Sequence, residues 1–261
     1  MRKISGVIIT YNNADIIVNC IKSIKWVDEL IVVDIGSKDH TLDLVKDFTS
    51  NIFSISFVEY VEKVRNFSLR KASGEWIFVI DPDEIVPKDA ERIIRTLIKD
   101  KSYDGYMFPR RNYINFNTYL RFGFFYPDYQ LRLFKNKKEI KYSGVIHEQA
   151  IINPKKVQKI NNLEIYHDYS YSKYDSFFSF HKFFRYIKIE GEFTAKSDRK
   201  NLHLLSEILL EFIRNFYRSF IKLSGYKDSY NGFRAAIIYS LYKSSIPLYS
   251  FLIRAKVFCK S

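Results

Sequence analysis

Short apolar runs alternate with helix-like segments through the first hundred residues, and no other feature of the sequence constrains the fold as strongly. The apolar runs that indicate buried strands are 4–10, 30–33, 55–58 and 76–80. Apolar residues recur at helical spacing in the segments 14–25, 38–48, 64–72 and 87–99. Ser37 is placed to cap the second of these helices, and Pro87 lies where proline favours the start of the fourth. Alternation of this period predicts a mostly parallel sheet with helices on both faces.

The pattern changes after residue 103. Further strands with irregular connections are expected over 105–109, 131–135, 145–150 and 163–167. From 171 the chain is predicted to be helical to its end, with Pro247 kinking or ending the last helix. We therefore predict a Rossmann-like α/β/α sandwich with a mixed sheet over 1–170, made of the halves 1–100 and 101–170, and a helical extension over 171–261.

Positive charge is concentrated behind residue 100. The formal net charge is +13, yet residues 1–100 hold 14 Lys and Arg against 16 Asp and Glu. Residues 101–198 hold 17 against 10, and residues 199–261 hold 11 against 3. This asymmetry favours a polyanionic partner for the rear of the chain, such as a membrane surface, a nucleic acid or a phosphorylated ligand, over a merely solubilising surface.

The two cysteines, Cys20 and Cys259, are too few and too far apart for a disulfide framework or a cysteine-based zinc site, and they suit a reducing compartment. The apolar run near Met1 is too short for a secretory leader, and no stretch of about 18 uncharged apolar residues predicts a transmembrane helix. We expect a cytoplasmic protein, with peripheral binding to the cytoplasmic face of the inner membrane as the alternative.

Polar residues follow three of the predicted strands. Thr10-Tyr11-Asn12, Asp34 and Asp81-Pro82-Asp83 stand where open α/β sheets bind ligands, beyond the carboxyl ends of strands. Glycine-rich dinucleotide and phosphate loops are absent from the sequence, which disfavours a redox dinucleotide and a P-loop. Asp34 can accept from a ribose hydroxyl or a base, and the two later carboxylates can share a ribose and Mg²⁺ or Mn²⁺. The pattern predicts a nucleotide site built from side chains.

At these positions the sequence resembles glycosyltransferase family 2, whose members are inverting nucleotide-sugar transferases with the GT-A fold. The resemblance is carried by Thr10-Tyr11-Asn12, Val32-Val33-Asp34 with Gly36-Ser37 and Asp39, Arg65-Asn66, Ala72-Ser73-Gly74-Glu75-Trp76 and Asp81-Pro82-Asp83-Glu84. The later segments 109–113, 126–134 and 145–148 resemble the branch of lipopolysaccharide core β-glucosyltransferases. Ile35 and Pro82 depart from the residues common in the family, which leaves the donor open.

The resemblance implies a role for each matching residue. The nucleotide-sugar site would comprise Thr10, Tyr11, Asn12, Asp34, Arg65, Asp81 and Asp83. Asp83 and His147 would hold the Mn²⁺ or Mg²⁺ of a DXD motif, and Asp128 would be the general base. Contacts to acceptor or substrate are expected, more weakly, from Arg110, Arg111, Tyr126 and Glu148, the last being also the rival base.

The implied activity is the transfer of a hexose-type sugar from a nucleotide-diphosphate sugar, with a UDP-sugar favoured, to an acceptor hydroxyl. The acceptor would be a bacterial cell-envelope glycan, a glycolipid or a protein, and the reaction a metal-assisted single displacement. Two alternatives stay open on the sequence alone: a basic nucleic-acid-binding protein and a metal-dependent nucleotidyltransferase. The first is disfavoured because acidic residues dominate the strand ends.

The basic segment 199–261 combines Lys and Arg with Phe, Tyr, Leu and Ile at helical spacing. Helices of this composition can lie in a membrane interface with their basic residues on anionic headgroups. The alternative is a helical cap that packs on the sheet or forms a homodimer.

Overall fold

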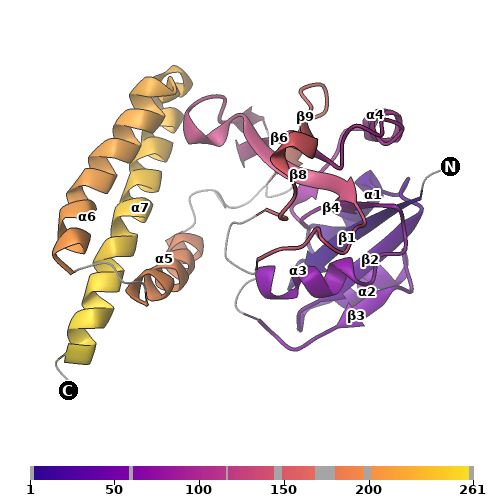
Figure 1. Cartoon of the computed structure of the whole chain (residues 1–261), viewed down its shortest axis with the longest axis horizontal. Coiled ribbons are helices and arrows are strands. Elements are labelled where there is room, and N and C mark those ends of the chain that lie inside the picture. Colours follow the sequence, from indigo (N-terminus) through magenta and orange to yellow (C-terminus); the bar gives the residue numbers. More distant parts are fainter. Residues whose placement is uncertain are drawn as a thin grey trace. The chain divides into compact units, whose positions relative to one another are not determined.

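The chain forms two compact units. The computed structural model describes residues 3–58, 61–115, 117–143, 149–167, 180–196 and 201–258. The first unit comprises Met1–Asn117 and Asp128–Ser172, and the second comprises Thr118–Pro127 and Lys173–Ser261 (Figure 1). The division lies close to the boundary predicted at 170, except that ten residues from the middle of the chain belong to the helical unit.

The first unit alternates strands and helices as the sequence predicts. Its elements are β1 (Ile4–Thr10), α1 (Ile17–Ser23), β2 (Glu29–Asp34), α2 (Thr41–Lys46), β3 (Ile52–Ser54), α3 (Glu62–Leu69), β4 (Trp76–Val79), β5 (Glu84–Ile85), α4 (Ala90–Leu97), β6 (Gly105–Asn115), β8 (Asp128–Lys135), the 3₁₀ turn η2 (Pro154–Lys156), β9 (Val157–Lys159) and β10 (Ile165–His167).

These strands form one mixed sheet, so the predicted α/β class with a mixed sheet is confirmed. The strand order is β3-β2-β1-β4-β8-β6-β10-β5, with β9 beside β6. Strands β3, β2, β1 and β4 are parallel, whereas β8 is antiparallel to both β4 and β6. These four parallel strands all lie within the half predicted over 1–100.

The core lies on both faces of this sheet. Side chains of β1 and β4 alternate between the faces, as the twofold period of a strand requires. Ile8 and Phe78 enter the cluster that includes residues of α1 and α4, whereas Val7 and Val79 enter the cluster that includes Val64 of α3. All of these side chains are buried. Each contributes about 1.5–3 kcal/mol when it leaves water, so the two layers hold the strand ends in a fixed relation.

Several predicted boundaries were wrong. Helix α2 begins at Thr41, and Ser37 does not cap it; the Asn12 backbone N–H instead donates to Ser37 Oγ across 2.8 Å. Pro87 lies in a turn before α4, where its carbonyl accepts from the Ala90 N–H at 3.0 Å. The third strand is Ile52–Ser54 rather than 55–58. In each case the element begins or ends a few residues away from the position that local periodicity predicts, because turns and side-chain hydrogen bonds occupy the intervening residues. The strand predicted over 145–150 falls mostly on residues outside the described ranges.

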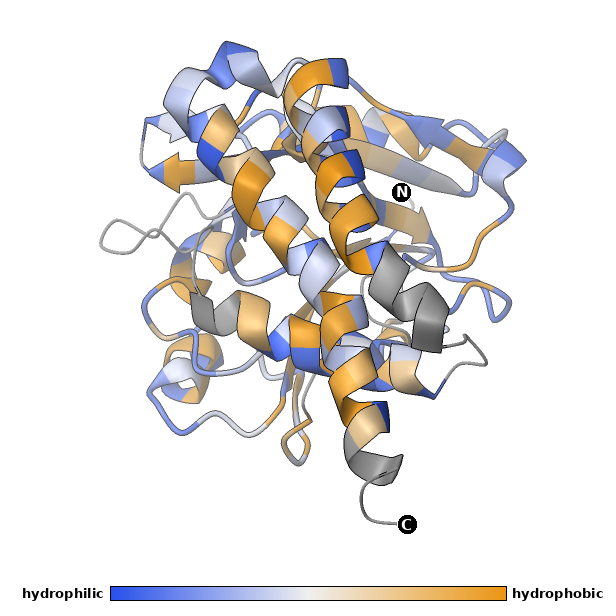
Figure 2. Ribbon diagram, turned by 90° about the vertical axis from the view of Figure 1, so that its left-hand side faces the viewer, coloured by the Kyte–Doolittle hydropathy of each residue, from blue (hydrophilic) through white to orange (hydrophobic). Residues whose placement is uncertain are grey.

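The second unit is helical. Its main elements are α5 (Phe180–Ala195), α6 (Asn201–Phe216), the π-helical segment η4 (Tyr217–Lys222), the 3₁₀ turn η5 (Gly225–Asp228) and α7 (Ser229–Phe258), with β7 (Thr118–Tyr119) and η1 (Gly123–Phe125) from the inserted segment. Helices α5 and α6 both pack on α7 (Figures 1 and 2). Pro247 lies inside α7, so it does not end this helix. None of the described helices has the combination of length and hydropathy that crossing a bilayer requires.

Hydrogen bonds donated by backbone N–H groups attach residues 118–127 to the rest of the helical unit. Asp228 Oδ2 accepts from the N–H groups of Arg121 and Phe122 at 2.8 and 2.9 Å. The Gly123 N–H donates to the Leu223 carbonyl at 3.0 Å. These contacts could not be predicted from local periodicity in the sequence, because they join segments about a hundred residues apart.

Two glycines allow α7 to start against η5. A Cβ added to Gly232 would lie 1.9 Å from the Gly225 carbonyl oxygen, which is backbone and has no flexible end to move aside. We therefore expect Gly232→Ala to destabilise the helical unit by about 3 kcal/mol, the upper range for overpacking. Ser245→Ala, on an exposed part of the same helix, is the control and should change stability little. Urea unfolding followed by circular dichroism measures both variants, and equal stability of Gly232→Ala and the native chain would contradict this packing.

Candidate active site

The sheet topology brings several distant segments to one edge. Thr10 and Asp34 are paired in register at the carboxyl ends of β1 and β2, and Asp81 follows β4. Because β8 runs antiparallel to β4, its first residue, Asp128, lies at the same edge.

The second half of the sheet adds its own residues to this edge. Arg110 of β6 pairs in register with Asp128 of β8. His167 of β10 pairs with Asn112 on one side and with Glu84 of β5 on the other. Residues from β5, β6, β8 and β10 therefore meet beside the carboxyl end of β4.

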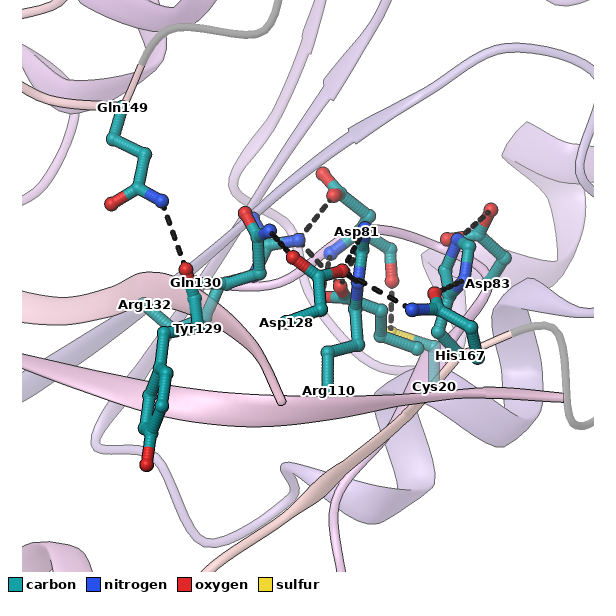
Figure 3. Close-up of polar contacts among 12 residues, drawn as sticks. Cys20, Asp81, Asp83, Arg110, Asp128, Tyr129, Gln130, Arg132, Gln149 and His167 are labelled. Carbon is teal, nitrogen blue, oxygen red and sulfur yellow. Dashed lines mark hydrogen bonds and ion pairs between the residues drawn. The ribbon is translucent and has the colours of Figure 1, made fainter. Parts of the chain in front are cut away.

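A buried cluster of ion pairs fills this edge (Figure 3). Arg132 Nη2, in a side chain only 5% exposed, lies 2.5 Å from both Asp81 Oδ2 and Glu84 Oε1. Arg110 contacts Glu84 Oε1 at 3.3 Å and Asp128 Oδ2 at 2.7 Å. The second oxygen of Glu84 accepts from the Asp81 backbone N–H at 3.1 Å. Charged groups that are withdrawn from water stay ionised only when they are paired with opposite charges, so each group fixes the position of the next.

Arg65 completes the charge balance. Its Nη2 lies 3.5 Å from Asp81 Oδ1, and its guanidinium stands over the Tyr142 ring at 5.1 Å. Burial favours the neutral form of Asp81, but Arg132 and then Arg65 and Arg110 outweigh it and hold the pKa of Asp81 well below its usual value. Three carboxylates are thus balanced by three arginines.

Asp128 is held as an ionised acceptor. Its Oδ2 accepts from Arg110 Nε at 2.9 Å and from Asn112 Nδ2 at 3.3 Å, and its Oδ1 accepts from Gln130 Nε2 at 2.6 Å. Burial raises the pKa of Asp128, but Arg110, with help from Asn112 and Gln130, lowers it below the ordinary value. The side chain is 22% exposed, so a ligand can approach it.

A chain of hydrogen bonds joins Asp128 to Asp83. Asn112 turns its amide nitrogen to Asp128, which only accepts, so its Oδ1 faces His167 Nδ1 at 2.8 Å. His167 Nδ1 therefore carries a proton, and in the neutral imidazole its Nε2 presents a lone pair. That Nε2 lies 3.5 Å from Asp83 Oδ2 (Figure 3). Two electron-pair donors facing each other at this distance are joined by a proton on the imidazole or by a cation.

Asp83 and His167 suit a divalent cation. A carboxylate and a neutral imidazole are accepted ligands of Mn²⁺, and a histidine ligand commonly donates its other ring N–H to an acceptor, as His167 does to Asn112. Among the described residues no three His, Cys, Asp or Glu side chains form a metal site alone.

The loops after β1 and β2 form the other part of the edge. Asn12 adopts a left-handed conformation, with φ of 51°, and its Oδ1 accepts from the Lys38 N–H at 2.7 Å. Asp34 is buried, and its Oδ2 accepts from the N–H groups of Gly36 and Ser37 at 3.0 and 3.1 Å. Thr10 Oγ1 donates to Asn13 Oδ1 at 3.0 Å. These bonds join the two loops into one rigid rim.

The more weakly predicted contacts are distributed differently. Arg110 lies within the ion-pair cluster, whereas its neighbour Arg111 points to the opposite face of β6 and pairs with Glu164. Tyr126 belongs to the second unit, where its ring stands 6.1 Å from that of Tyr119. The predicted metal ligand His147 and the rival base Glu148 lie outside the described residues.

Four residues of this site had no assigned role in the sequence analysis: Glu84, Asn112, Arg132 and His167. A signal existed for Glu84, which directly follows the paired aspartates, and for Arg132, an arginine inside an apolar strand. Buried charges of that kind require partners. Asn112 and His167 gave no signal, because only the pairing of β6 with β10 brings them together.

Several known proteins are similar to this chain. A family model described as Glycosyl transferase family 2 matches residues 5–160. The glycosyltransferase SunS of Bacillus subtilis is 29% identical over 209 residues, which cover 77% of this chain and 44% of SunS. An uncharacterized glycosyltransferase of Rickettsia bellii is 25% identical over 241 residues, covering 87% of this chain and 81% of that protein.

Among solved structures, S. aureus TarS aligns with a TM-score of 0.48 and 14% identity, covering 99% of this chain and 92% of that chain. This chain spans less than half the length of the first curated relatives that it matches, SunS among them.

The ion-pair cluster predicts a large and pH-dependent effect of Arg132→Gln. Removing this cation leaves the fully buried Glu84 and the partly buried Asp81 without their main partner, which should destabilise the first unit by about 3–5 kcal/mol at pH 7. Arg92→Gln, at a side chain 77% exposed, should cost less than about 1 kcal/mol and serves as the control. Urea unfolding followed by tryptophan fluorescence measures both.

The sign of the pH effect follows from the lowered pKa of Asp81. In the native chain the stability from its ionised form is present above the unfolded pKa of about 4 and is lost as the pH falls below it. In Arg132→Gln, protonation of Asp81 removes a charge that has lost its main partner. The loss of unfolding free energy relative to the native chain should therefore become smaller as the pH falls from 6 to 3. A loss of unfolding free energy that is small at pH 7, or that becomes larger in acid, would contradict the proposed role of the ion-pair cluster.

Proposed function

The chain belongs to glycosyl transferase family 2, and we propose that it transfers a hexose-type sugar from a nucleotide-diphosphate sugar to an acceptor hydroxyl. The observation that supports this most directly is the meeting of Asp34, Asp83, His167 and Asp128 at one edge of the sheet. The donor class to test first is a UDP-sugar. The nucleotidyltransferase alternative loses support, because the family match spans the paired carboxylates on which it rested. The nucleic-acid-binding alternative rested on the overall basic charge, much of which lies behind the matched residues.

The nucleotide would lie against the rim formed by the loops after β1 and β2. Asp34 keeps lone pairs beyond those used by Gly36 and Ser37, so it can accept from a ribose hydroxyl or a base N–H. Tyr11 pairs with Phe57 at a centroid distance of 5.0 Å, and Phe57 is 57% exposed. A partly exposed aromatic pair of this kind offers a surface on which a base can stack.

Asp83 and His167 would hold Mn²⁺ or Mg²⁺. When bound, such a cation supplies Lewis-acid stabilisation of the charge that develops on the departing diphosphate. Asp81 would act differently from the role implied by the family resemblance: with Arg132 and Arg65 on its two oxygens, it holds the turn that carries Asp83. Cys20 assists, since its buried thiol donates to the Asp81 carbonyl at 3.4 Å.

Asp128 would receive the acceptor's proton. The acceptor oxygen forms a bond to the anomeric carbon, the bond from that carbon to the diphosphate oxygen breaks, and the hydroxyl proton passes to Asp128 Oδ1. Arg110 makes Asp128 a weak base, so the proton moves once the acceptor oxygen has gained positive charge from bond formation. A single displacement of this kind inverts the anomeric carbon and needs no protein nucleophile.

We propose a bacterial cell-envelope glycan, a glycolipid or a protein as the acceptor, with the reaction at the cytoplasmic side of the membrane. The lipopolysaccharide branch of the family supports this choice through the segments 109–113 and 126–134.

Donor binding and transfer should respond differently to two substitutions. With UDP at 100 times its dissociation constant and Mn²⁺ present, the native chain should gain about 2.7 kcal/mol of stability. Asp83→Asn should lose the Mn²⁺-dependent part of this gain, because a cation ligand is gone. Asp128→Asn should keep the gain but transfer sugar about 10²–10⁴-fold more slowly. Thermal shifts and a sugar-transfer assay measure the two effects.

Asp89→Asn, at a side chain 53% exposed, is the matched control and should behave as the native chain does. A full Mn²⁺-dependent shift in Asp83→Asn would remove this residue from the cation site. Normal transfer by Asp128→Asn would make Glu148 the candidate base.

A further inference from the structure

The outward face of the α6–η4 helix carries two parallel rows of side chains. Residues four apart lie above one another on an α-helix, and the exposed positions keep that spacing from α6 through the π-helical segment η4. The apolar row is Leu209, Ile213, Tyr217 and Ile221, whose exposed fractions are 66, 54, 58 and 48%. The row beside it is Leu210, Arg214, Arg218 and Lys222, all exposed. We refer to these eight residues as the α6–η4 face.

The opposite side of the same helix is already packed. Phe216 and Phe220 meet Phe233 of α7 at centroid distances of 6.0 and 5.6 Å, and Ser219 is buried. The α6–η4 face therefore lies on the side of this helix that is turned away from its contacts with α7. Single exposed apolar residues are ordinary, but a continuous row over three turns indicates a surface that binds something.

The charges beside the apolar row indicate what that partner is. None of the eight positions is acidic, and the three cations stand on one flank of the apolar row. Arg214 is 63% exposed and pairs with Glu211 of the same helix at 2.8 Å, and Arg218 stacks at 5.3 Å on the Phe124 ring, which holds it in place. The surrounding segment 199–261 carries 11 Lys and Arg against 3 Asp and Glu.

We propose that the α6–η4 face lies on an anionic lipid surface. A helix in the plane of a membrane places its apolar row among the upper acyl chains and its basic residues on phosphate headgroups, which is the order of the two rows here. Tyr217 belongs to the apolar row, and its ring and hydroxyl suit the boundary between acyl chains and water. The inference goes beyond sugar transfer and does not depend on it.

The test is flotation of the full chain with vesicles, without nucleotide. The native chain should bind vesicles of phosphatidylcholine with 25% phosphatidylglycerol at low salt, and bind pure phosphatidylcholine much more weakly. High salt should release most of it, because screening weakens the contacts of the cations. The triple substitution Arg214→Gln, Arg218→Gln, Lys222→Gln should lower the partition coefficient roughly hundredfold, at about fivefold for each basic residue.

A matched control removes the same charge elsewhere. Lys22→Gln, Lys25→Gln, Lys99→Gln changes three exposed lysines of the first unit and should bind nearly as the native chain does. Ile213→Ser with Ile221→Ser should weaken binding at least tenfold, since each isoleucine leaving water contributes about that factor. Circular dichroism tests whether the variants are folded. If the double serine variant is unfolded, the three charge substitutions alone decide whether this face binds lipid.

Two results would overturn the proposal. One is equal binding by the native chain and the Arg214, Arg218, Lys222 variant, which would place the lipid contact elsewhere. The other is no vesicle binding by the native chain; if sedimentation then showed a dimer that Ile213→Ser with Ile221→Ser dissociates, the face would be a contact between two copies.

Discussion

The candidate site depends on the burial of ionised groups beside the carboxyl end of β4. Arg132 joins Asp81 to Glu84, and Arg110 joins Glu84 to Asp128. A network of this kind adds little net stability, because removing the charges from water opposes their attraction. Its effect is geometric: the strand pairing and the ion pairs determine each other, and the groups that face the ligand are held before the ligand arrives.

The same network separates the roles of two neighbouring aspartates. Asp81 is neutralised by arginines, so it holds the turn in place, and Asp83 is left to face His167. Asn112 connects this pair to Asp128 and sets which nitrogen of His167 carries the proton. The proposed cation ligands and the proposed base are thus parts of one hydrogen-bonded chain across β6 and β10.

Much of this arrangement could be predicted from the sequence, and the reason is local. Strand periodicity and the polar residues after each strand predicted Asp34, Asp81 and Asp83 at one edge, because parallel strands end together. The partners of those residues could not be predicted, since they depend on the order β4-β8-β6-β10. Arg132 and His167 reach the site from separate strands, and the attachment of 118–127 to the helices likewise depends on contacts distant in sequence.

The most direct test of this account measures the cation ligands themselves. Pulsed electron paramagnetic resonance of Mn²⁺ bound with UDP detects an imidazole nitrogen on the metal. We predict nitrogen coupling in the native chain, its loss in His167→Gln and its retention in His40→Gln, whose side chain is exposed. Coupling that persists in His167→Gln and disappears in His147→Gln would contradict the assignment of His167, and no bound Mn²⁺ at all would contradict the cation site.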